Sequence, residues 1–321
     1  MKKLSTLLGL CLALAAPSMA LANDYPTKPI RIVLPYAPGG PTDTVARAVA
    51  QQMAKKLGTA IIIDNRPGAD STIGTQHVVQ SPADGYSLLF GTSSTFINAS
   101  IYKLNYDPSH ELAGIGLVGT QYLVLVTRPD LKFENVNAFI KQVKERSAGY
   151  NYGTSGSTVT LVTELFHTHA GISVGQRIPY NGNAPLLNAF YSGVLDYSFM
   201  SLDSGIVGIR SGKLLPLAVT APTRVAALPQ IPTTLEAGVP ESSAGVSYFL
   251  GAPRNTPPAV LEKLNEALNQ ALASPDVKEL GNKFAGLVLS EKTSIEEANR
   301  YMKFEQVRWA PIVKKTGVKP G

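Results

Sequence analysis

The segment YAPGGPTD, residues 36–43, combines residue types that can bind a small anion without a charged side chain. It follows a short apolar run and precedes an apolar pattern of helical period. Glycines such as Gly39 and Gly40 allow tight turns whose backbone N–H groups point at a ligand, and a helix N-terminus adds free donors and partial positive charge. The segment therefore predicts a binding loop for a carboxylate or phosphate. The alternative is an ordinary strand-to-helix turn, capped by Thr42 or Asp43.

Three further loops share this composition, because each follows a strand-like run and is rich in Gly, Ser and Thr. They are GTSSTF at 91–96, GTSGST at 153–158 and MSLDSG at 200–205. In open α/β sheets, ligands bind beyond the carboxyl ends of the strands, where such loops lie. Hydroxyl groups both donate and accept hydrogen bonds. We therefore expect the loops to face a shared ligand cleft, with these candidate contacts: Thr92, Ser93, Ser94, Thr154, Ser155, Ser157 and Asp203.

Signals for catalysis or metal binding are weak in this sequence. No phosphate loop ending in G-K-[ST] is present. His167 and His169 are two residues apart, so on a helix they face different directions and cannot form an i, i+4 metal pair. Asp196 fits a turn before a strand, and Asp203 fits a helix start at the edge of the cleft. We therefore expect no enzyme activity, no cofactor and no metal site.

Strand-like and helix-like patterns alternate along the chain, which indicates an α/β fold with mainly parallel sheets. Strand-like runs lie at 30–36, 60–64, 86–92, 122–128, 150–154, 195–201, 214–220 and 247–252. Helical periodicity occurs at 43–57, ended by Gly58, and at 135–149, 160–171, 257–284 and 294–317. With 321 residues the chain is long enough for two lobes. We expect one lobe of residues 23–123 plus about 222–321, and another of about 124–221, with the ligand cleft between them.

The first 22 residues have the pattern of a cleavable export signal. Lys2 and Lys3 precede an apolar stretch, and a small-x-small sequence ends at Ala22. The alternative is a membrane anchor, but the apolar stretch is shorter than the roughly 20 residues needed to span a bilayer. Cleavage after Ala22 would remove Cys11, the one cysteine of the chain. The export signal therefore predicts a periplasmic protein. Its remainder is mildly basic with scattered charges, so we expect that it neither binds nucleic acid nor inserts into the membrane.

Seven segments, taken in order, resemble those of one family. They are YPTKPIRIVLPYAPGGPTDTVAR, NRPGADSTIG, SPADGYSLLFGTSST, LNYDPSHELAGIGLVG, IPYNGNAPLLNAFYSGVLDYSF, SGKLLPLAVTAPTRVAALPQIPTTLEAGVP and APRNTPPAVLEKLN. The family is that of the extracytoplasmic solute receptors of tripartite tricarboxylate transporters, also called the Bug family. The resemblance covers nearly all of the chain after the leader.

This resemblance implies a two-lobe periplasmic-binding-protein fold, the Venus flytrap of type II, with a ligand cleft between the lobes. It implies a small carboxylate ligand held largely by backbone groups, a monomeric receptor, and integral-membrane transporter subunits as partners. The first-loop positions that it implicates are Tyr36, Ala37, Pro38, Gly39, Gly40 and Asp43.

Two departures from the family pattern bear on the ligand. Members commonly carry a longer second-lobe loop with a histidine, whereas this chain has GSTVTLV. Members also often carry Asp where this chain has Met200, with Asp203 three residues later. Both residues are counted as candidate ligand contacts. The change predicts an aromatic or medium-length dicarboxylate, such as a phthalate-type acid, rather than a small hydroxy acid such as citrate. The alternatives are a receptor of this fold that serves a signalling partner and, less favoured, a periplasmic hydrolase.

Overall fold

The computed structural model describes residues 24–146, 149–173, 175–180, 182–239, 244–316 and 318. The expected export signal at 1–22 lies outside the described residues. Over the part of the chain that is described, no helix has both the length and the apolarity needed to cross a membrane.

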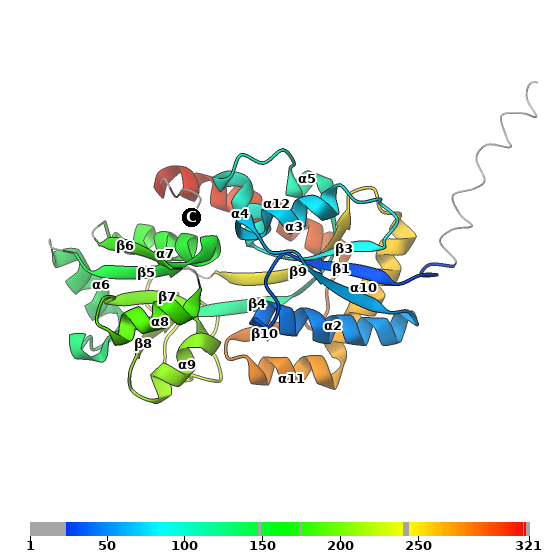
Figure 1. Cartoon of the computed structure of the whole chain (residues 1–321). Coiled ribbons are helices and arrows are strands. Elements are labelled where there is room, and N and C mark those ends of the chain that lie inside the picture. Colours follow the sequence, from blue (N-terminus) through cyan, green and yellow to red (C-terminus); the bar gives the residue numbers. More distant parts are fainter. Residues whose placement is uncertain are drawn as a thin grey trace, which may run out of the picture.

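The first half of the molecule is built from both the N-terminal and the C-terminal parts of the described chain, and the last helix extends from it over the second half (Figure 1). Its strands are β1 (Ile30–Leu34), β2 (Ile61–Asn65), β3 (Ser87–Thr92), β4 (Leu112–Thr127), β9 (Gly245–Pro253) and β10 (Leu287–Leu289). Its helices are α2 (Pro41–Leu57), α3 (Thr72–Val79), α4 (Ser94–Ile101), α5 (Pro108–Glu111), α10 (Pro258–Ala273), α11 (Pro275–Lys283) and α12 (Ile295–Thr316). The strands run in the order β2-β1-β3-β9-β4, and β10 pairs with β4 as well.

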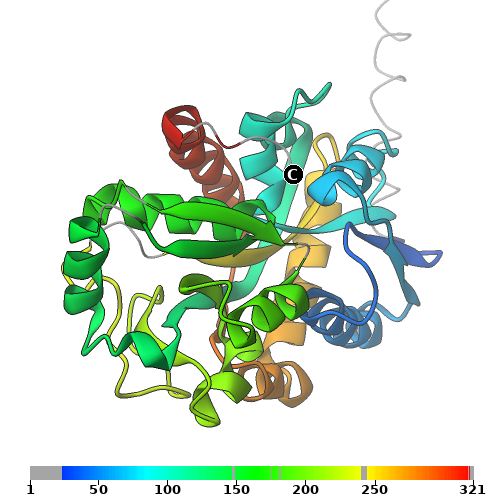
Figure 2. The ribbon, with the colours of Figure 1, turned by 60° about the vertical axis from the view of Figure 1, so that its left-hand side comes forward.

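The second half comes from the middle of the chain and lies beside the first half in both views (Figures 1 and 2). Its strands are β5 (Asn151–Ser155), β6 (Gln176–Tyr180), β7 (Tyr197–Ser201) and β8 (Leu215–Val219). Its helices are α6 (Val136–Glu145), α7 (Gly156–Ala170), α8 (Asn183–Tyr191) and α9 (Leu202–Arg210). The sheet continues from β4 in the order β4-β7-β5-β6, and β8 also pairs with β4.

Strand β4 belongs to both halves. Residues Leu112–Tyr122 pair with β9, and residues Leu123–Thr127 pair with β7. The sequence pattern predicted only the second part of this strand, at 122–128. The first part contains GIGLVG, a G-x-G-x-x-G sequence that would suggest a nucleotide loop in another context. Here the glycines lie inside the strand and admit close packing: a Cβ at Gly114 would lie 2.7 Å from Cβ of Ala298 in α12.

The expectation of mainly parallel sheets is wrong for the centre of the molecule. Parallel pairs occur within each half, where β1 pairs with β2 and β3, and β5 pairs with β6 and β7. Strands β4 and β9 pair antiparallel with their neighbours. The reason is that β4 carries the chain from the first half to the second, and β9 carries it back. The two strands therefore run antiparallel where they pair.

The predicted helix at 43–57 is confirmed as α2, which begins slightly earlier at Pro41. Its buried positions Val45, Val49 and Met53 recur every fourth residue and pack into the core of the first half. Gly58 ends the helix in the left-handed conformation, with φ of 65°. The expected break between α10 and α11 also occurs, at a serine whose hydroxyl caps α11.

Helix α12 contacts both halves. Its first turns pack on β4 and α4 of the first half. Further along, Trp309 and Val313 are buried in a hydrophobic cluster with Phe139, Phe166 and other residues of the second half. Thus the last helix, which was expected to belong to one lobe, reaches the core of the other.

Several elements gave too little signal in the sequence to be expected. Helices α3, α4 and α8 have eight or nine residues each, which is too short for a clear helical period. The helix start expected at Asp203 is found as the short helix α9. Strand β6 lies at the edge of the sheet and is largely exposed, so it lacks an apolar run. Apart from β4, which begins ten residues earlier than expected, the expected strands are found within two residues of their predicted bounds.

Candidate ligand-binding site

A cavity of about 270 Å³, here called the front cleft, lies where the two halves meet. The first half contributes residues from the loops after β1 and β3 and from β9, and the second half contributes the loops after β5 and β7. This is the carboxyl edge of the parallel strands, as expected for a ligand site in an α/β sheet. Of the predicted contact residues, six line the front cleft: Tyr36, Thr92, Ser94, Ser155, Ser157 and Asp203.

The other predicted contacts lie elsewhere. Ala37, Pro38 and Gly39 form an exposed turn that leads to the half-buried Gly40, between the lining residues Tyr36 and Pro41. The remaining four are Asp43, Ser93, Thr154 and Met200, all of which are buried.

Helix N-termini from both halves are directed at the front cleft. Helix α2 supplies Pro41 and Thr42, and α7 supplies Gly156, Ser157 and Thr158. Over the described residues, neither helix receives a side-chain hydrogen bond from its N-cap residue. Among the helices that begin elsewhere, α6 and α11 are capped by Asn135 and Ser274, whereas α10 also lacks a side-chain cap. Uncapped first-turn N–H groups are available to a carboxylate, and the helix dipole favours its negative charge.

The side chains of the front cleft carry negative rather than positive charge. Among its described lining residues there are two carboxylates, Asp70 and Asp203, and no Lys, Arg or His. Burial raises the pKa of the Asp203 carboxyl above its usual value. The buried Oδ1 atom of Asp203 and the hydroxyl of Ser157 have no hydrogen-bond partner among the described residues. Both groups can therefore form hydrogen bonds with a ligand.

The first loop is fastened from behind by Asp43. Its Oδ2 accepts hydrogen bonds from the backbone N–H of Gly39 at 3.1 Å and from Nε of Arg47 at 2.8 Å. Its Oδ1 accepts one from Nδ2 of Asn65, which also donates to the carbonyl of Tyr36. The Arg47 guanidinium is the main reason why the pKa of Asp43 falls to about 2. Asp43 thus positions the loop instead of lining the cavity.

Hydroxyl groups connect the two halves across the front cleft. Oγ1 of Thr158 in α7 lies 3.1 Å from Oγ of Ser94 in α4. On the other side, Nδ2 of Asn183 donates to the hydroxyls of Ser201 and Ser204, and its Oδ1 accepts from Ser155. Sequence reasoning missed Asn183, although a glycine-containing turn directly before a helix could have indicated it. Gln121 was missed because it lies in the unexpected part of β4.

Strained backbone borders the cavity at a turn that the sequence did not single out. Ala69, Asp70 and Ser71 all have positive φ, at 43°, 47° and 79°. Residues other than glycine rarely adopt this region, and such strain occurs preferentially at ligand sites. The amide of Asn98 donates to the carbonyl of Asp70 and holds the turn in place. The side chain of Asp70 lines the front cleft as a result.

Met200 does not line the front cleft. It is fully buried and packs beside Val124 and Gly205 in a hydrophobic cluster of the second half. The reason is the alternation of side chains along β7, because the next residue, Ser201, points into the cleft. The polarity of the cleft is therefore independent of Met200.

The front cleft continues into a second cavity, here called the outer cleft, of about 520 Å³. The two cavities share Asp70, Gly156 and Ser157. Thr154, which was predicted as a contact, lines this outer part. So does Arg177 of β6, the one cation among the described residues that line either cavity. A ligand that extends beyond the front cleft would approach this guanidinium.

None of the four histidines lines the front cleft or the outer cleft. His167 is buried, and its Nε2 lies 2.9 Å from the hydroxyl of Tyr197. Burial lowers the pKa of His167 to about 4, so the ring is neutral at pH 7. Asp196 accepts hydrogen bonds from the Asn151 backbone and the Arg128 side chain just before β7, as expected for a turn residue. Within the described residues, no cluster of three or more His, Cys, Asp or Glu could hold a metal ion.

One sequence, GISVG at 171–175, matches the G-x-S-x-G pattern of serine hydrolases. A nucleophile elbow requires a turn from a strand into a helix. Here Gly171 ends helix α7 and β6 follows. The connection runs in the opposite sense, so the match does not indicate a nucleophile.

Two α/β halves that enclose a cleft lined by hydroxyls and helix N-termini define a solute-binding receptor of the periplasmic type. The profile of the tripartite tricarboxylate transporter family receptor matches residues 45–318, and the chain belongs to this family. Members of the family bind substrates and are not enzymes, as the sequence led us to expect.

The full-length similarity extends to named relatives. The chain is 33% identical to the BugT protein of Bordetella pertussis over 99% of both chains. The Rhodopseudomonas palustris protein Rpa4515, solved with adipate, is 30% identical, with a TM-score of 0.78 over 93% of this chain and 100% of that one. MatC of the same organism, solved with malate, is 28% identical, with a TM-score of 0.76 over 90% and 100%. Other solved relatives are periplasmic proteins as well, so the chain is a periplasmic solute-binding receptor.

Proposed function

We propose that the front cleft binds a small organic dicarboxylate, which the receptor delivers to the membrane subunits of a tripartite tricarboxylate transporter. The observation that carries this proposal is the pair of uncapped helix N-termini, from α2 and α7, at one cavity. They offer N–H donors to a carboxylate from both halves at once. The bound malate and adipate of two relatives support the same ligand class.

A medium-length acid suits this cavity better than a compact hydroxy acid such as citrate. The front cleft of about 270 Å³ opens into the outer cleft of about 520 Å³, so that a second carboxylate has room beyond the first. Arg177 lies in that direction. Because Met200 does not line the front cleft, the lining gives no specific support for an aromatic ligand. We therefore favour a dicarboxylate chain of about six carbons, with a phthalate-type acid as the aromatic alternative.

The two halves correspond in this proposal to two lobes that close on the ligand. We place the first boundary where β4 changes partner, between Tyr122 and Leu123, and the return within residues 221–250. A ligand shifts the equilibrium toward closure by its differential affinity for the closed state. The leader at residues 1–22 would direct export of the chain to the periplasm and would be cleaved after Ala22.

A thermal-shift screen of the ligand-stripped protein tests the ligand class. The panel contains malate, adipate, phthalate and citrate, with hexanoate and benzoate as matched monocarboxylates. A ligand that binds only the native state adds roughly 2.7 kcal/mol of stability at a hundredfold excess over its Kd. We expect the largest shift with adipate or phthalate. Stabilisation by the monocarboxylates alone would contradict the proposed dicarboxylate, and the absence of any shift would contradict carboxylate binding.

A further inference from the structure

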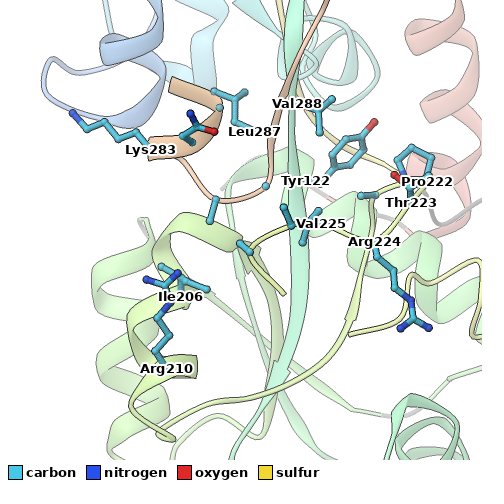
Figure 3. A pocket seen from close by; sticks show the side chains of 17 residues that line it. Tyr122, Ile206, Arg210, Pro222, Thr223, Arg224, Val225, Lys283, Leu287 and Val288 are labelled. Atoms are coloured by element: carbon cyan, nitrogen blue, oxygen red, sulfur yellow. The ribbon is translucent and has the colours of Figure 1, made fainter. Parts of the chain in front are cut away.

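A third cavity, larger than the front cleft, lies away from both the front cleft and the outer cleft. This rear groove, of about 550 Å³, is formed by α9, the segment 221–227, the segment 281–288 and Tyr122 of β4 (Figure 3). It shares no lining residue with the front or outer cleft. Its walls come from both halves of the molecule, as those of the front cleft do.

Strand β4 separates the two cavities. Gln121 and Leu123 line the front cleft, whereas Tyr122 between them lines the rear groove. Successive side chains of a strand point to opposite faces, so the rear groove lies behind the strand at whose front the ligand site is found. A molecule in the groove would therefore not occupy the ligand site.

The charged residues of the rear groove are all cations. Arg210, Arg224 and Lys283 line it, and no acidic residue is present among its described lining residues. Arg224 is engaged, because its Nε donates to both carboxylate oxygens of Glu236 at 3.0 Å and its Nη1 donates to the Pro229 carbonyl.

The other two cations have few partners. Lys283 lies 5.8 Å from the ring centroid of Phe284. The side chain of Arg210 makes no hydrogen bond or ion pair with another described residue. Both residues are exposed, and Figure 3 shows them on the same side of the groove, at the ends of α11 and α9. An anion can therefore reach the Arg210 guanidinium without displacing an existing partner.

The floor of the rear groove is apolar. Ile206 of α9, Val225 and Leu287 lie between the cations and Tyr122 (Figure 3). Val288 at its edge is 52% exposed. The groove therefore offers apolar surface to a ligand beside the charged residues.

We propose that the rear groove is a second binding site, for an amphipathic organic anion. Its carboxylate or sulfonate would pair with Arg210, and its apolar body would cover Ile206, Val225 and Leu287. The volume falls within the 300–1,000 Å³ typical of small-molecule sites. The chemistry differs from that of the front cleft, because formal charge and apolar area replace backbone N–H groups and hydroxyls. This inference does not depend on the identity of the front-cleft ligand.

The probe for this site is 8-anilinonaphthalene-1-sulfonate, an aromatic anion whose fluorescence rises in apolar surroundings. We expect saturable binding to the wild-type protein. Arg210→Glu should weaken that binding at least tenfold, since it reverses the charge at the head group. Ile206→Asp should weaken it similarly by placing a carboxylate on the floor. Arg210→Lys, which keeps the charge, should retain most of the affinity. Circular dichroism melts of each variant establish that it is folded.

Two controls decide the location of the probe. Arg300→Glu makes the same charge change at an exposed residue of α12, outside the three cavities, and should leave the affinity within twofold. Val307→Asp removes another exposed apolar side chain and should also have no effect. Equal loss in Arg300→Glu and Arg210→Glu, or no loss in a folded Arg210→Glu protein, would overturn the proposal. Stoichiometric displacement of the probe by a front-cleft acid would overturn it as well.

Discussion

The front cleft and the rear groove lie on opposite faces of β4 and use opposite ends of helices. Helices α2 and α7 begin at the front cleft, where two carboxylates are the charged side chains. Helices α9 and α11 end at the rear groove, with the cations Arg210 and Lys283 as their last residues. Helix α9 takes part in both, because its first turn carries Asp203 and its last turn carries Arg210.

This difference shows two ways to attract an anion. At the front, helix dipoles and N–H groups supply the positive potential, so the lining needs no cation and can hold carboxylates that contact other parts of the ligand. At the rear, helix C-termini are negative and the cations offset them. The front cleft is therefore sensitive to changes in backbone access, whereas the rear groove is sensitive to changes in side-chain charge.

The largest loss of acid binding is expected from a carboxylate placed at the N-terminus of α7. Ser157→Asp should lower the affinity for the acid with the largest thermal shift about 100-fold. The reason is that like charges about 5 Å apart repel by roughly 3 kcal/mol at the effective dielectric of a protein surface. Isothermal titration calorimetry measures the loss. Asn135→Asp, at the start of α6 away from the cleft, is the matched control, and equal losses in the two variants would contradict the role of α7.

Gly40→Val tests backbone access at α2. Gly40 has an ordinary φ of −80°, and a Cβ there would meet no atom within 4 Å, so the fold should tolerate the change. We expect at least tenfold weaker acid binding, because the branched side chain would stand between the ligand and the N–H groups of α2. Gly39→Val adds backbone strain, since φ of Gly39 is +88°. Normal affinity in folded Gly40→Val protein would show that the first loop is only a turn.

Asp43→Asn removes the negative charge that holds the first loop in position. Loss of charge-assisted hydrogen bonds should destabilise the protein by about 1–3 kcal/mol at pH 7 and weaken acid binding severalfold. The pKa of Asp43 is about 2 when folded against a usual 3.8, so its contribution is fully present above pH 3.8 and is lost as the pH falls toward 2. Urea unfolding at pH 7 and pH 2.5 should show the gap between variant and wild type narrowing.

His167→Ala should have the smallest effect on binding. The ring lies in the core of the second half beside Tyr152 and Tyr197, away from all three cavities, so acid affinity should stay within twofold. Stability should fall instead. Because burial lowers the pKa of His167 from 6.5 to about 4, its stabilising effect is present above pH 6.5 and is lost as the pH falls toward 4. A large loss of affinity would show that packing around His167 in the second half affects the geometry of the front cleft.

The sequence predicted the elements with long or strongly apolar patterns, and the loops between them. Val45, Val49 and Met53 mark α2 because a buried helix face repeats every three to four residues. The glycines of β4 concealed the first part of the longest strand, since they admit close approach of α10, α12 and β10, which no local pattern records.

The candidate site was predictable where a loop directly follows a strand. Ser155 and Ser157 fit this rule, and both line the cleft. Gln121 and Asn183 could not be found in this way, because antiparallel pairing and a short helix place them there. Met200 was misplaced for a simpler reason: one step along a strand turns a side chain to the other face.

Helix α12 has a mechanical consequence. Two rigid bodies joined at two points can turn freely about the line between those points, whereas a third attachment off that line restrains the rotation. Strands β4 and β9 supply the first two attachments, and Trp309, buried beneath α12 in the core of the second half, supplies the third. In the two-lobe movement proposed above, this helix would act as a strap that limits how far the halves separate, so that its length would set the range of angles open to the receptor.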